Sequence, residues 1–285
     1  MSRPIAVGVD GSDGSLAAVD WAADEAALRA APLRLVYATQ WIPHQPQAVR
    51  MTHEERAEEA GDVLGAMEER ARARRPQLTL AAEEVEDAPA RVLLDAGSEA
   101  DILVVGTHGL SGIGGFMVGS VGQEVVADAK QPVVLVRPDY REDAHGEHGR
   151  NKVVLGLDID DAADEVLEFA FDYAARRGVP LHVLHSWHAP FLHRHRVAAD
   201  TDSGPRAEMA SALAQAVRPY RDKYPAVDVA EESAIGRPAD RLVEEAADAR
   251  LVVLGRRRGH GSHIGSTSHA LIHHAACPVA VVPHG

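Results

Sequence analysis

The chain has 285 residues, 46% of them hydrophobic and 25% charged, which is enough for about two globular domains with buried cores. Its formal net charge of −14 excludes the basic surface that nonspecific binding to nucleic acid or anionic membranes requires. The sequence has no apolar run of the roughly 20 residues that a membrane span needs, and it lacks a secretion-signal pattern at its start. Because Cys277 is the single cysteine, no intrachain disulfide is expected, and we predict a cytoplasmic location.

Short apolar runs alternate with longer amphipathic segments along the first half of the chain. Near-continuous apolar runs are typical of strands that helices cover on both faces. We expect strands at residues 5–9, 33–38, 80–85, 102–106 and 133–136, and helices at 15–31, 52–74, 89–98 and 120–128. Regular alternation of strand and helix predicts right-handed crossovers and a parallel, doubly wound α/β sheet.

The second half repeats the first at offsets of 146 to 149 residues. Val7-Gly8-Val9-Asp10 returns as Leu155-Gly156-Leu157-Asp158, and Gly119-Ser120 returns as Gly265-Ser266. The corresponding strands are expected at residues 152–158, 181–186, 227–233, 251–255 and 279–282. Residues 139–150 are polar and lack apolar periodicity, so the prediction is a domain at 1–138, a linker at 139–150 and a second domain at 151–285.

A glycine-rich segment follows the fourth predicted strand. Five of the eleven residues from Gly109 to Gly119, both included, are glycines, and the next predicted helix begins at Ser120. Glycine lets backbone N–H groups approach phosphate oxygens, and a helix N-terminus adds its positive dipole end. A plain turn would also explain glycines alone. The segment has no Gly-Lys-Ser/Thr and is therefore not a P-loop.

The spacing Gly106-x2-Gly109-x9-Gly119-Ser120 resembles the pattern of ATP-binding universal stress proteins at every defined position. The resemblance covers most of the chain, except the linker and the stretches around residues 40–55 and 188–206. It implies two tandem Rossmann-like domains of the adenine nucleotide alpha hydrolase-like type, each a five-stranded parallel sheet between helices. It also implies that ATP, with Mg²⁺ as its charge partner, binds the first copy at Gly8, Asp10, Ala38, Gly106, His108, Gly109, Gly119, Ser120 and Val121.

Two of these positions carry distinct roles in the resemblance. Asp10 corresponds to the acidic residue that lies against the nucleoside, although an aspartate before Gly-Ser is also a common helix cap. Ala38 falls where the family offers backbone groups to the adenine edge, so its side chain is uninformative.

The second copy departs from the pattern. Its loop is three residues shorter, arginine stands at position 258 where glycine is expected, and Ile159-Asp160 replaces Gly11-Ser12. A weaker nucleotide site would use Gly156, Asp158, Gly255, Gly265 and Ser266. Arg256, Arg257 and Arg258 either supply donors in place of the glycine loop or form a solvated basic turn.

Histidine is abundant, with 16 residues, and raises the question of a metal site. His269 and His273 are four residues apart on a predicted helix, but no carboxylate or cysteine completes a ligand set. We therefore expect no metal site, and the sequence offers no catalytic residues beyond a possible base at His108.

The function implied by the resemblance is nucleotide-dependent regulation, read out as a change of conformation or association under stress. Family domains commonly associate through their last strands, which predicts pairing within the chain or a homo-oligomer, with an unknown protein partner. Two alternatives stay open: an ATP-consuming enzyme, of which we expect at most weak hydrolysis, and an interaction scaffold without nucleotide.

Overall fold

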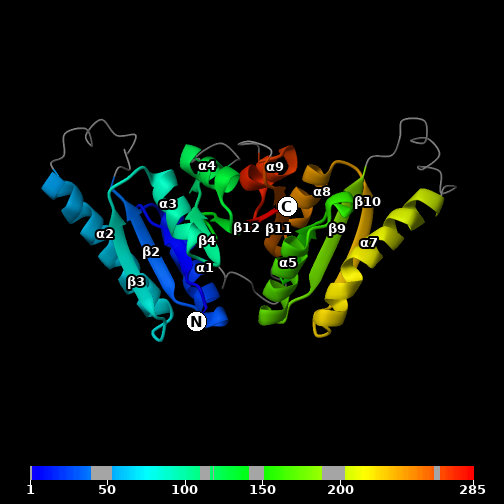
Figure 1. Cartoon of the computed structure of the whole chain (residues 1–285), viewed down its shortest axis with the longest axis horizontal. Helices are drawn as coiled ribbons and strands as arrows, with labels where there is room; N and C mark the ends of the chain where they lie inside the picture. Colours follow the sequence, from blue (N-terminus) through cyan, green and yellow to red (C-terminus); the bar gives the residue numbers. More distant parts are fainter. Residues whose placement is uncertain are drawn as a thin grey trace. The chain divides into compact units, whose positions relative to one another are not determined.

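A computed structural model describes residues 2–39, 53–109, 116–117, 119–140, 151–187, 203–259 and 264–285. These residues form two compact α/β units that correspond to the two halves of the chain (Figure 1). Among the described helices, none has an apolar stretch long enough to cross a lipid bilayer.

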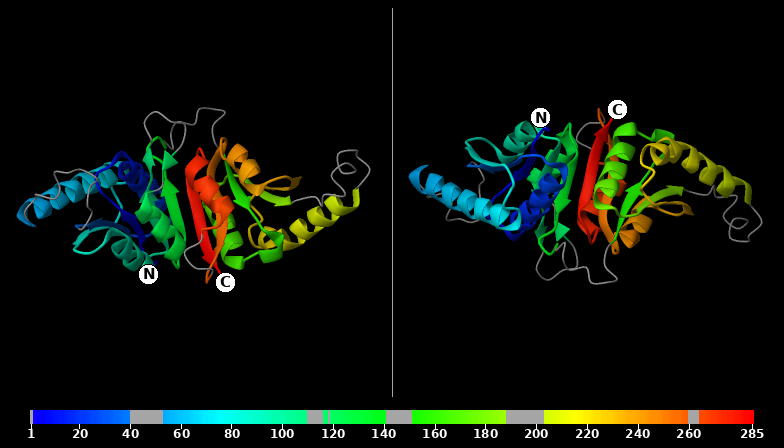
Figure 2. Two further views of the ribbon diagram at one scale, coloured as in Figure 1. Left: turned by 90° about the horizontal axis from the view of Figure 1, so that it is seen from above. Right: turned by 90° about the horizontal axis from the view of Figure 1, so that it is seen from below.

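The first unit contains a five-stranded parallel sheet in the order β3-β2-β1-β4-β7. Its strands are β1 (Ile5–Gly8), β2 (Leu33–Ala38), β3 (Leu80–Val85), β4 (Ile102–Gly106) and β7 (Val133–Val136). Its helices are α1 (Asp13–Arg29), α2 (His53–Arg74), α3 (Pro89–Ser98) and α4 (Ser120–Asp128). The contacts put α1 with α2, and α3 with α4, so that helices cover both faces of the sheet (Figure 2).

The second unit repeats this architecture with the strand order β10-β9-β8-β11-β12. Its strands are β8 (Lys152–Gly156), β9 (Leu181–Trp187), β10 (Val229–Ile235), β11 (Ala249–Arg257) and β12 (Val279–His284). Its helical segments are the 3-10 turn η2 (Ile159–Asp161), α5 (Asp164–Arg177), α7 (Ser203–Lys223), α8 (Pro238–Glu245) and α9 (Ser266–His274). The predicted fold class, two tandem doubly wound parallel sheets, is confirmed.

The apolar runs form strands because helices bury them from both sides. The side chains of Ile5, Val7, Leu103 and Val104 in the central strands β1 and β4 have no exposed surface. Edge strand β3, by contrast, contains only half-buried and exposed residues. The burial of such apolar surface, at about 25 cal/mol per Å², is the main stabilising contribution to each sheet.

Among the differences from the sequence prediction, two lie close to the predicted site of the first copy. Helix α1 begins at Asp13 rather than residue 15, because the Ser12 side chain accepts the Ser15 N–H and caps the helix. In addition, the two-residue strands β5 (His108–Gly109) and β6 (Phe116–Met117) pair antiparallel inside the predicted glycine-rich loop.

Candidate functional site

The predicted residues of the first copy gather at one edge of its sheet. The order of strands reverses between β1 and β4, since β2 lies on one side of β1 and β4 on the other. Asp10 follows the carboxyl end of β1, and Gly106 is the last residue of β4. Open parallel sheets bind ligands in the crevice at such a switch point. This edge is therefore the place to examine for a ligand site.

The half-buried carboxylate of Asp10 organises the turn that leads into α1. Its Oδ1 accepts the backbone N–H of Ser12 at 3.0 Å and the Ser12 hydroxyl at 2.6 Å. Ser12 in turn caps the helix through Ser15. Asp10 therefore supports the helix cap through Ser12 with one oxygen, and its Oδ2 has no hydrogen bond from the described residues.

Gly106 has a packing role that the motif did not indicate. A Cβ atom there would overlap the backbone of Gly14 and the N atom of Ser15, and a Cβ atom on Gly14 would overlap the carbonyl oxygen of Thr107. The end of β4 and the first turn of α1 therefore touch backbone to backbone, which only glycine allows at both positions. Gly106 is required to bring these two segments together, whether or not a ligand is bound.

Thr107 is a residue of this edge that the motif analysis missed. It is 2% exposed, and its backbone N–H donates to the Val136 carbonyl at 2.8 Å. Its buried Oγ1 has no hydrogen-bond partner among the described residues. A buried hydroxyl without a partner costs about 1–3 kcal/mol, so this group stands out in a well-packed core. Thr107 occupies an unspecified position of the motif, so the spacing pattern could not have identified it.

The remaining loop residues are only partly described. His108 and Gly109 form β5 and pair with Met117 and Phe116, which closes the base of the loop as a short hairpin. Residues 110–115 and 118 of the predicted phosphate loop lie outside the described residues.

The N-terminus of α4 offers unpaired backbone donors. Gly119 is its N-cap, no side chain caps the helix, and its first turn contains no acidic residue. A Cβ atom on Gly119 would meet no atom within 4 Å, and both Gly119 and Ser120 are exposed. The first intrahelical bond runs from Gln123 N–H to the Gly119 carbonyl. The N–H groups of Ser120 and Val121 therefore lie at the positive end of the helix dipole, where there is room for an anion.

The other predicted residues, Gly8 and Ala38, lie at the ends of β1 and β2. A Cβ atom on Gly8 would meet the Leu93 side chain of α3 at 2.5 Å, so packing again accounts for a glycine. Ala38 is buried at the last pair of the β2–β3 ladder, opposite Val85.

The end of β2 is an acidic environment. Beside Ala38, burial raises the pKa of Tyr37, and the nearby carboxylates of Glu59, Asp10 and Glu84 raise it further. Negative charge therefore collects around the β1 and β2 ends, whereas the α4 end carries the positive helix terminus.

The second copy has a different carboxyl edge. Strand β11 continues two residues beyond Gly255, and Arg256 and Arg257 pair with Pro283 and His284 of β12. The sequence analysis expected these arginines in the loop, so this expectation is wrong for the first two. They extend the ladder because β12 also runs further, to His284.

Two arginines of the second copy are engaged by neighbouring groups of the same unit. Arg257 Nε donates to Asp161 at 2.8 Å and Arg258 Nη2 donates to the Pro283 carbonyl at 3.2 Å. The ion pair with Asp161 raises the pKa of Arg257, with a further contribution from Asp158. These contacts leave Arg257 and Arg258 less able to replace a glycine loop as anion donors.

The turn before α5 differs as well. Four residues (9–12) join β1 to α1, whereas seven (157–163) join β8 to α5 and include η2, from which Asp161 reaches Arg257. The Cβ position of Gly255 faces the side chains of His284 and Val166, not a helix backbone. Helix α9, like α4, begins at an uncapped glycine, Gly265, and Ser266 beside it is exposed.

In each copy a nitrogen-bearing side chain lies between two carboxylates. In the first unit Arg34 donates to Glu83 at 2.6 Å and to Glu99 at 2.7 Å. In the second unit, the corresponding residue of β9 is His182. Its Nε2 lies 3.2 Å from Glu232 Oε2 and its Nδ1 lies 3.2 Å from Glu245 Oε2.

These three residues of the second unit are the group of possible metal ligands found among the described residues. However, Lys152 binds Glu245 at 2.5 Å and Arg241 binds Glu232 at 2.8 Å. The charges of both carboxylates are therefore already balanced by protein cations. Burial alone would raise the pKa of Glu245, but the hydrogen bond and charge of Lys152, followed by His182, lower it overall.

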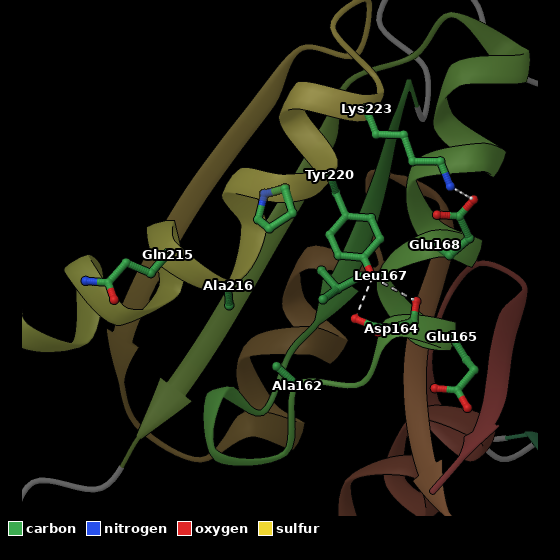
Figure 3. Close-up of a pocket in the computed structure, with 10 residues that line it drawn as sticks. Ala162, Asp164, Glu165, Leu167, Glu168, Gln215, Ala216, Tyr220 and Lys223 are labelled. Atoms are coloured by element: carbon green, nitrogen blue, oxygen red, sulfur yellow. Dashed lines mark hydrogen bonds and ion pairs between the residues drawn. The ribbon is translucent and has the colours of Figure 1, made fainter.

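A groove between α5 and α7 lies apart from the predicted site residues (Figure 3). It has a volume of about 820 Å³ and is lined by residues that include Leu167, Ala216 and Pro219. Four of its polar side chains form two pairs, since the Tyr220 hydroxyl donates to Asp164 at 2.7 Å and Lys223 binds Glu168 at 2.6 Å. Burial and the Asp164 hydrogen bond raise the pKa of Tyr220, and the groove gathers no set of available polar groups that would define a ligand.

Comparison with known proteins agrees with the duplicated fold. The model of the universal stress protein family matches residues 1–137 and again residues 149–283. The chain therefore belongs to the universal stress protein family.

Similar proteins match this chain along nearly their whole length. A universal stress protein of Mycolicibacterium smegmatis is 34% identical over 300 residues, covering 98% of this chain and 96% of that protein. One from Mycobacterium tuberculosis is 30% identical over 296 residues, covering 99% of both. The crystal structure of a universal stress protein from Archaeoglobus fulgidus covers 100% of both chains with a TM-score of 0.72 at 19% identity, which supports the fold.

Proposed function

We propose that this universal stress protein is an ATP-binding regulator whose first copy holds the nucleotide at the β1–β4 edge. The observation that carries the proposal is the bare N-terminus of α4, where no side chain caps the helix and Gly119 leaves open space. The unpaired N–H groups at the start of a helix can bind an anion. The net charge of this chain is strongly negative and repels phosphate, so a phosphate ligand must be held by local donors of this kind.

Electrostatics favours one orientation of the nucleotide. Asp10, Glu59 and Glu84 surround the end of β2, so phosphates would be repelled there, and the uncharged nucleoside fits that side. The phosphates would lie at Ser120 and Val121, where N–H groups and the Ser120 hydroxyl can donate. The free Oδ2 of Asp10 is available to accept a ribose hydroxyl. Mg²⁺ would neutralise part of the triphosphate charge.

The proposal assigns one nucleotide to each chain. In the second copy the Asp161–Arg257 pair and the longer β11 occupy the edge that is open in the first. The output would be a change of conformation or association, with ATP turnover far below the ~10 s⁻¹ of a median enzyme. An interaction scaffold without nucleotide is the alternative if no ATP binds.

The test is calorimetric titration of the full chain with MgATP, comparing wild type with Gly119→Glu. A carboxylate within about 4 Å of phosphate costs several kcal/mol in a partly dry site, so affinity should fall at least about 100-fold. Gly65→Glu is the matched control, because Gly65 is exposed on α2 with no atom within 4 Å of its Cβ position. Equal affinity in a folded Gly119→Glu protein would contradict the site, and no binding to wild type would favour the scaffold.

A further inference from the structure

Helix α9 carries two histidines one turn apart whose rings lie together. The ring centroids of His269 and His273 are 4.5 Å apart, with an angle of 49° between the ring planes. His269 is exposed and His273 is half-buried. Side chains four residues apart share one face of a helix, so both imidazoles lie on the same face of α9.

The separation of the rings suits a shared metal ion. Imidazole nitrogens bind Zn²⁺ at about 2.0–2.1 Å, so two of them on one tetrahedral ion lie roughly 3.3 Å apart. Two rings whose centroids are 4.5 Å apart can bring one nitrogen each to that separation by rotation about side-chain torsions, which are broad for histidine. We propose that His269 and His273 form an open chelate for a divalent first-row transition metal, with water in the other coordination positions.

The position on the helix favours a cation. His273 lies in the last turn of α9, where the negative end of the helix dipole stabilises positive charge. The helix contains no lysine or arginine that would repel the ion. His274, also in the last turn, has its ring centroid 6.5 Å from that of His273 and is not four residues from His269, so it is outside the pair.

The first copy lacks this feature. The same positions of α4 hold Gln123 and Ala127, so a metal-binding face belongs to the second copy alone within this helix pair. The sequence prediction of no metal site depended on the missing third ligand. The proximity of the two rings allows a two-histidine site in which water supplies the remaining ligands, and the inference does not depend on ATP binding.

The experiment is calorimetric titration of the nucleotide-free full chain with Zn²⁺ at about pH 7.5. Wild type should bind one Zn²⁺ at this site with micromolar affinity, and His269→Ala or His273→Gln should weaken that binding at least about tenfold. His274→Ala is the matched control, an exposed histidine of the same helix outside the pair, and should stay within about twofold of wild type. Because His269 is exposed, its variant should fold normally, which circular dichroism checks. Unchanged Zn²⁺ affinity in the double variant His269→Ala/His273→Gln would overturn the proposal.

Discussion

The contact between β4 and α1 makes a quantitative prediction about Gly106. In Gly106→Ala the new methyl group would overlap the carbonyl carbon and oxygen of Gly14 and the amide nitrogen of Ser15. These are backbone atoms, so the strain cannot be relieved by a side-chain rotation. Overpacking costs about 1–3 kcal/mol in typical cores, and a backbone clash belongs at the upper end. For a domain of about 140 residues, a loss near 3 kcal/mol lowers the midpoint of thermal unfolding by roughly 6–12 °C.

Two matched glycine-to-alanine variants test the reasoning behind this number. Gly65→Ala places its methyl group in open space within helix α2 and should raise stability by about 0.5–1 kcal/mol, since alanine is the better helix former. Gly255→Ala places its methyl group 2.9 Å from the His284 ring and near Val166, both side chains that can shift, so its cost should be intermediate.

The assay is thermal and urea unfolding of the full chain, followed by circular dichroism. The expected order of stability is Gly65→Ala above wild type, then Gly255→Ala, then Gly106→Ala. If the free energy of unfolding of Gly106→Ala lay within about 0.5 kcal/mol of the wild-type value, the packing role would be refuted. Ligand binding would then be the remaining reason for a glycine at this position.

Two further variants probe buried polar groups. Thr107→Val removes a buried hydroxyl that has no partner among the described residues, so urea unfolding should give a free energy of unfolding about 1 kcal/mol higher, and a lower value would mean that the hydroxyl is bonded. Lys152→Met removes the cation that does most to lower the pKa of Glu245. Because the folded pKa is lowered, the ionised carboxylate stabilises the folded protein at pH values above the unfolded carboxyl pKa of about 4.3. This stability is lost as the pH falls through the lower pKa of the folded state. The variant should therefore be about 1 kcal/mol less stable near pH 7, and pH-dependent unfolding curves should converge below about pH 4; a constant gap would mean that charge is not the cause.

The strands and helices of both copies could be predicted because burial on two faces leaves a strong apolar pattern. The β2, β3, β4, β7, α3 and α4 boundaries agree with the sequence prediction. What could not be predicted depends on contacts between distant residues. Gly106 was interpreted as a phosphate-loop glycine, but its packing role needs Gly14, which lies 92 residues earlier. The charged residues Arg256 and Arg257 resemble a solvated turn, yet pairing with β12 makes them a strand.

The candidate site could be predicted as a set of positions but not as a set of roles. Of the described motif glycines of the first copy, Gly119 alone combines an exposed helix N-cap with open space at its Cβ position. Close packing explains why Gly8 and Gly106 are glycines. A spacing pattern therefore does not distinguish glycines that the fold requires from glycines that face a ligand. Thr107 was absent from the prediction because its signal, an unpaired buried hydroxyl, exists only in three dimensions.

The turn at Asp10 couples any ligand at this edge to the start of α1. Oδ1 holds Ser12, and Ser12 caps the helix, so a ligand that rotated the carboxylate would also release the cap. Loss of a cap costs about 1 kcal/mol, which would be subtracted from the binding free energy and lower the affinity about fivefold. A ligand that engages Oδ2 and leaves Oδ1 in place avoids this cost. The turn thereby favours ligands that approach the Asp10 carboxylate from the Oδ2 side over ligands that approach it from the Oδ1 side.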